Sequence, residues 1–125
     1  MMTEEWPERS LVEDVLAHAA EDWVVPALLL TVVRDACGVK DPHALRDMAV
    51  GLLARLVADG LVVIGDVRGT HVPWNCRPEE AVLRVAQEWA LREDPFVMPG
   101  ELFWLDATPA GEAIGKAVWA REAEA

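Results

Sequence analysis

The sequence predicts a single domain with a mainly helical α+β fold, built from four to five helices and two or three short strands. The chain has 125 residues, a length that fits one domain. Hydrophobic residues make up 53% of it, which is too many for a disordered chain. Capping residues and prolines stand before several apolar segments of helical period, whereas β-branched runs are few and short.

The first helix is predicted to begin after Ser10. Ser10 and Glu13 form a capping box, in which each side chain satisfies a backbone amide at the helix start. Apolar residues then recur on one face at helical spacing: Leu11, Val12, Val15, Leu16 and Ala19. Residues 1–9 are predicted to form an acidic leader, whose flexibility is left open.

The second and third predicted helices form the centre of the domain. The second spans about residues 26–36, with Pro26 in its first turn and Gly38 just past its end, and it is apolar almost all round. The third begins at the cap Asp41 and stops at Gly60. Its predicted buried stripe consists of Leu45, Met48, Leu52, Leu53, Leu56 and Val57.

The second half of the chain combines short strands with two further helices. A β-branched strand is predicted over residues 61–64, with a turn at Gly65-Asp66 and another at Arg68-Gly69. The fourth helix spans about residues 78–92, where Glu80–Arg84 and Glu88–Arg92 have the spacing of ion pairs.

A loop over residues 93–101 leads to the final strand and helix. It contains Pro95, Pro99 and Gly100, and a short strand is predicted after it over residues 102–105. Thr108-Pro109 repeats the cap-plus-proline signal and opens the last helix. That helix carries the apolar residues Ala113, Ile114, Ala117 and Val118.

Two motifs accompany this order of elements. LLARLVADGLV at residues 52–62 matches L-x-x-L-x-x-x-G-L-V, and WLDATPAG at residues 104–111 is similar to L-T-x-x-G with Ala107 in place of the leucine. Together they resemble the winged-helix regulators of the multiple-antibiotic-resistance and phenolic-acid-decarboxylase types, over about residues 26–118. The resemblance implies a helix-turn-helix with a small β-wing and DNA binding as a dimer. The chain departs from the family at residues 68–101, which form an enlarged wing with an inserted helix.

The charge distribution weighs against DNA binding. The net charge is −11, and it is concentrated in the two flanks: residues 1–24 hold seven acidic residues and one basic, and residues 76–125 hold ten and five. DNA-binding proteins neutralise about 6–10 phosphates. Arg46, Arg55 and Arg68 are the plausible DNA-facing cations, so only a dimer would approach that number.

The outward face of the third helix is also unusual for base recognition, which favours Arg, Lys, Asn or Gln. Its predicted outward residues are His43, Arg46, Asp47, Val50, Ala54 and Arg55. Asp47 would repel phosphate, and Val50 with Ala54 forms a small apolar patch. That patch is either a protein-contact surface or a surface that packs against the inserted helix.

Metal, catalytic and membrane functions find little support in the sequence. Cys37 and Cys76 are isolated, no ligand spacing joins them to His43 or His71, and no catalytic or phosphate-binding motif is present. We therefore expect no metal, no cofactor and no enzymatic activity. The longest apolar run falls short of the ~20 residues of a membrane span, and the first five residues lack a secretory pattern. A cytoplasmic location is expected, and the preference for arginine over lysine suggests a GC-rich bacterial genome.

The six tryptophans are an unusual aromatic choice in a chain that has no tyrosine. Trp23, Trp89 and Trp104 fit apolar stripes of the core. Trp6, Trp74 and Trp119 do not, and tryptophan is enriched at interface hot spots, so Trp74 and Trp119 are candidates for a partner surface or a dimer seam. The alternative is that they cover a small core.

Three functional hypotheses follow. The favoured one is a non-enzymatic protein-binding module whose acidic surface engages a basic protein, as an immunity protein, antitoxin or accessory subunit does. Its candidate residues are Asp47, Val50, Trp74 and Trp119. The alternative is a dimeric DNA-binding regulator that uses His43, Arg46, Arg55 and Arg68. In a third, the inserted helix encloses a ligand pocket against the second helix.

Overall fold

The structure is a computed structural model that describes residues 8–124. Within them, five helices and a small three-stranded sheet confirm the predicted α+β fold class. The predictions for the acidic leader and for Trp6 fall outside the described residues, except at Glu8 and Arg9. The elements are α1 (Leu11–Ala19), α2 (Pro26–Cys37), α3 (Pro42–Ala58), β1 (Val62–Arg68), β2 (Thr70–Pro73), α4 (Pro78–Ala90), β3 (Trp104–Ala107) and α5 (Pro109–Glu124).

The sheet is antiparallel, with the strand order β2-β1-β3. The segment between α1 and α2 adds to its edge, because Val24 exchanges backbone hydrogen bonds with Leu105 of β3. The predicted turn at Gly65-Asp66 is wrong: β1 continues to Arg68, and the chain turns at Gly69, where φ is +78°. Gly65 lies between both neighbouring strands, and a Cβ there would collide with the Val72 carbonyl. The glycine therefore serves a close strand approach and not a turn.

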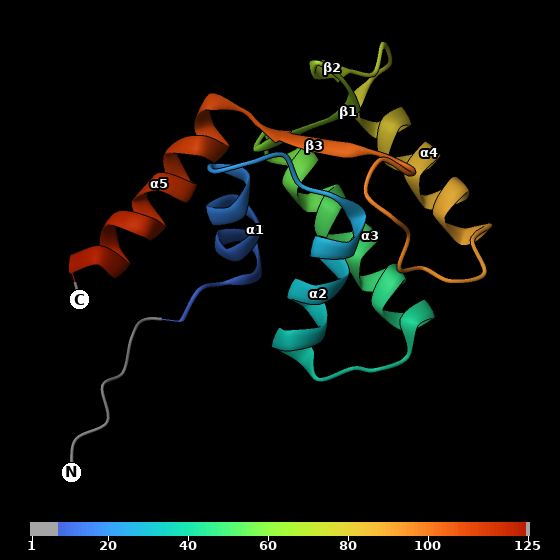
Figure 1. Ribbon diagram of the computed structural model, residues 1–125, viewed down its shortest axis with the longest axis horizontal. Coiled ribbons are helices and arrows are strands. Elements are labelled where there is room, and N and C mark those ends of the chain that lie inside the picture. The colour runs from blue at the N-terminus through green and yellow to red at the C-terminus, as the bar shows by residue number, and fades with distance from the viewer. Residues whose placement is uncertain (1–7, 125) are drawn as a thin grey trace.

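α2 and α3 pack against each other between α1 and α4 (Figure 1), and both supply buried residues of the core. The stripe predicted for α3 is largely correct, since Leu45, Leu52, Leu53 and Leu56 are buried. Met48 is 37% exposed, however, and Ala49 takes its place against the core. The buried face runs from Leu45 through Ala49, four positions later, to Leu52 and Leu56. Position 48 therefore lies at the edge of this face.

α4 packs on α3 and the sheet, on the side of the molecule opposite α1 and α5 (Figure 1). It is anchored by Trp89, which is completely buried and donates a hydrogen bond from Nε1 to the Pro95 carbonyl at 2.9 Å. The helix ends at Ala90, two residues earlier than predicted. Arg92, beyond the helix end, pairs with Glu101 at 2.6 Å, and Glu88 pairs with Arg84 at 2.9 Å. The predicted pairs Glu80–Arg84 and Glu88–Arg92 are therefore wrong.

α5 lies beside α1 (Figure 1). Its buried face consists of Gly111, Gly115 and Val118, while Ala113 and Ala117, predicted to be apolar contacts, are exposed. A Cβ at Gly115 would collide with the Leu16 carbonyl of α1, so this glycine allows the two helix backbones to approach closely. None of the helices within residues 8–124 is long and apolar enough to cross a membrane.

Candidate partner-binding surface

Three of the predicted site residues meet at the start of α3. The Arg46 guanidinium donates hydrogen bonds to Asp47 Oδ1 at 3.0 and 3.2 Å, and its Nη1 lies 3.2 Å from Nδ1 of His43. The Arg46 side chain is only 16% exposed. Its charge is thus balanced by Asp47 within the same helix, and little of it faces solvent.

The apolar patch predicted on α3 lies next to α4. Val50 is half-buried against the core, and Ala54 lines a shallow hollow together with Pro78 and Val82 of α4. α4 therefore runs along the side of α3 that carries Ala54. This arrangement corresponds to the packing alternative for Ala54, while Val50 packs against the core.

The remaining predicted cations differ in their surroundings. Arg55 is 71% exposed, and its Nε lies 3.8 Å from Asp59. Arg68 is exposed at the tip of the β1–β2 hairpin and, like Lys40, has no carboxylate partner among residues 8–124. The other nine of the eleven basic residues form ion pairs within the chain: Arg9, Arg34, Arg46, Arg55, Arg77, Arg84, Arg92, Lys116 and Arg121.

Trp74 is held between the sheet and α4. Its backbone amide donates to the Ile64 carbonyl at 3.0 Å, and the Arg84 guanidinium lies 3.7 Å from the centre of its ring. The ring forms one wall of a mostly apolar cavity of about 230 Å³, whose lining comes from α3, β1, α4 and the adjoining loops. The third hypothesis placed such a pocket against the second helix, but no α2 residue lines this cavity.

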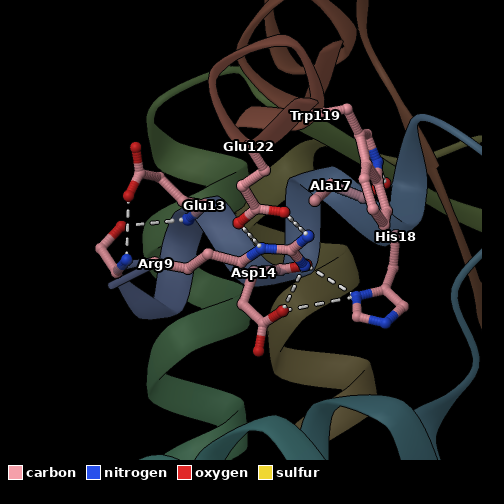
Figure 2. Close-up of polar contacts among 8 residues, drawn as sticks. Arg9, Glu13, Asp14, Ala17, His18, Trp119 and Glu122 are labelled. Atoms are coloured by element: carbon pink, nitrogen blue, oxygen red, sulfur yellow. Dashed lines mark hydrogen bonds and ion pairs between the residues drawn. The ribbon is translucent and has the colours of Figure 1, made fainter. Parts of the chain in front are cut away.

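Trp119 joins α5 to α1, as Figure 2 shows. Its indole Nε1 donates to the Ala17 carbonyl at 2.7 Å, and the Arg9 guanidinium stacks 4.6 Å from its ring centre. Arg9 also donates to both carboxylate oxygens of Glu122, at 2.6 and 2.7 Å, and to Asp14 at 3.0 Å. We call the cluster of Arg9, Asp14, Trp119 and Glu122 the Arg9 clasp. Sequence reasoning missed it, because Arg9 and Glu122 are 113 positions apart and share no local motif.

The clasp shifts the pKa values of Arg9 and Glu122. Hydrogen bonds from Arg9 lower the pKa of the Glu122 carboxyl, and the same contact raises the pKa of Arg9. The pKa of Glu13 is lowered by the Ser10 amide of the capping box and by Arg121, whose Nη1 donates to it at 2.9 Å. The carboxylates of Glu13 and Glu122 therefore stay charged and accept hydrogen bonds from donors of the same chain. They stabilise the fold and are not free to bind a partner.

The packing of α1 on α5 also brings the two acidic flanks together. Glu21 and Asp22, which follow α1, and Asp106 and Glu112, from β3 and α5, line one open hollow of about 310 Å³. Glu112 pairs with Lys116 at 2.8 Å, while Glu21, Asp22 and Asp106 have no ion-pair partner among residues 8–124. We call this the acidic hollow, and none of the described residues that line it is basic.

The acidic hollow has the chemistry to accept a guanidinium or ammonium group. Carboxylates from both sides attract a cation, and the half-buried ring of Trp23 lies among them as an aromatic surface for a cation–π contact. Trp23 is itself braced by Trp104, whose ring centre lies 6.4 Å away in an edge-to-face arrangement. The sequence revealed the two acidic flanks but not their convergence, which depends on the contact between α1 and α5.

The chain matches no protein family, no curated protein and no solved structure. Within residues 8–124, no three His, Cys, Asp or Glu side chains are grouped so that they could hold a metal ion. The charge and shape of this surface are therefore the basis for a functional proposal.

Proposed function

We propose that the protein is a non-enzymatic binding module whose acidic surface engages a basic protein partner. The supporting observation is the distribution of charge. Nine of eleven basic side chains are balanced by carboxylates of the same chain, and unpaired carboxylates from both flanks surround the acidic hollow. Complementary charge accelerates the encounter with a basic partner and disfavours acidic ones.

The surroundings of α3 favour this function over DNA binding. A helix that enters the major groove must present cations and free side chains to the bases. Here Arg46 is mostly covered and paired with Asp47, and α4 lies along the flank that carries Ala54. α4 is fixed by the buried Trp89 and is therefore part of the core.

The partner belongs to the class of basic proteins that an acidic module holds or restrains. An immunity protein or antitoxin bound to its toxin has this character, as does an accessory subunit of a nucleic-acid enzyme. We place the module in the bacterial cytoplasm. A homodimer is a second assembly to test for under either function, and DNA is a partner only under the alternative.

The test is affinity capture from the native host lysate with the full chain as bait. We expect one basic protein to be retained after nuclease treatment and released by salt, because exposed charge pairs are screened. The double variant Glu21→Gln/Asp106→Asn should weaken this binding by about tenfold. Glu93→Gln/Glu124→Gln, which removes the same charge from exposed positions outside the hollow, should not.

The opposite results are equally clear. Retention of a discrete DNA fragment, lost on nuclease treatment, would support the regulator and contradict the binding module. Equal weakening by both double variants would mean that net charge matters and that the acidic hollow does not.

A further inference from the structure

We draw no further inference here: the strongest candidate, the mostly apolar cavity of about 230 Å³ beside Trp74 and between α3, β1 and α4, carries none, because nothing among residues 8–124 shows what covers it.

Discussion

The Arg9 guanidinium lies 4.6 Å from the centre of the Trp119 ring and donates hydrogen bonds to the carboxylates of Glu122 and Asp14. This contact connects the segment that precedes α1 to the last turns of α5 (Figure 2). The same pair of helices carries or adjoins the carboxylates of the acidic hollow. The proposed binding surface therefore depends on how firmly α5 is held against α1.

Replacement of Arg9 should lower the stability of the fold. Arg9→Ala removes a stacked, bidentate contact in which the arginine side chain is 19% exposed, and we expect a loss of about 1–2 kcal/mol in the free energy of unfolding. Arg55→Ala, which removes a 71% exposed arginine with a loose contact, should change it by less than about 0.5 kcal/mol. Denaturant unfolding compares the two, and equal losses would show that the clasp adds nothing.

The clasp should also give the protein a specific acid sensitivity. The pKa of Glu122 is lowered from its ordinary 4.5 by hydrogen bonds from Arg9, so the folded state binds fewer protons at this carboxyl than the unfolded chain. Its stabilising effect is therefore complete above the unfolded pKa and is lost as the pH falls through the lower, folded pKa. Arg9 stays protonated throughout this range.

The measurement is the stability difference between the wild type and Glu122→Gln as a function of pH. We expect a gap near neutral pH that closes as the pH falls below the ordinary pKa of 4.5 and through the lower pKa of the folded state. Comparison of the two proteins removes the effect of the many other carboxylates, which titrate in both. A gap that stays constant with pH would mean that the Glu122 charge makes no contribution.

The sequence predicted the helices well because their signals are local. The Ser10–Glu13 capping box, the Asp41 cap and the left-handed Gly38 at the end of α2 all act within one helical turn, and the structure shows each of them. Gly65 misled the prediction, because a glycine is needed there for the close approach to the Val72 carbonyl of another strand, and turn statistics do not contain that contact.

The candidate site was less accessible to sequence reasoning, because it depends on distant contacts. Trp119 was recognised as unusual, but its partner Arg9 lies at the other end of the chain. The acidic hollow joins residues from the two flanks, and the cavity beside Trp74 joins three separate segments. Charge counting identified the right composition, and only the packing of α5 on α1 and of α4 on α3 shows where it is gathered.

Two glycine substitutions should have opposite effects on stability. Gly51 lies in the exposed interior of α3, where an added methyl group would meet only open space, so Gly51→Ala should raise the free energy of unfolding by about 0.5–1 kcal/mol. Gly115→Ala should lower it by about 2 kcal/mol, since its Cβ would collide with the Leu16 carbonyl and press on Ala20. Thermal or denaturant unfolding provides both values. Stabilisation by both substitutions would show that α1 and α5 are not in close backbone contact.

The DNA-binding alternative makes its own prediction for Arg55. If α3 of each subunit of a dimer entered the major groove, Arg55→Ala would remove two phosphate contacts per complex, and the slope of the logarithm of affinity against the logarithm of salt concentration would fall by about 1.8, which is about 0.9 for each contact. We expect no such change: duplex affinity should be weak and independent of sequence, with the same slope for wild type, Arg55→Ala and the control Arg77→Ala.

The control arginine is matched in its surroundings. Arg77 is 78% exposed and lies 3.9 Å from Glu80, much as Arg55 is 71% exposed and lies 3.8 Å from Asp59. Electrophoretic mobility shifts over a salt series with a pool of random duplexes measure all three proteins. Selective binding of one duplex, reduced by Arg55→Ala and unaffected by Arg77→Ala, would place α3 on DNA despite its neighbour α4. The acidic flanks would then repel DNA from the remaining surface and confine it to the face of α3. That result would favour the DNA-binding regulator over the protein-binding module.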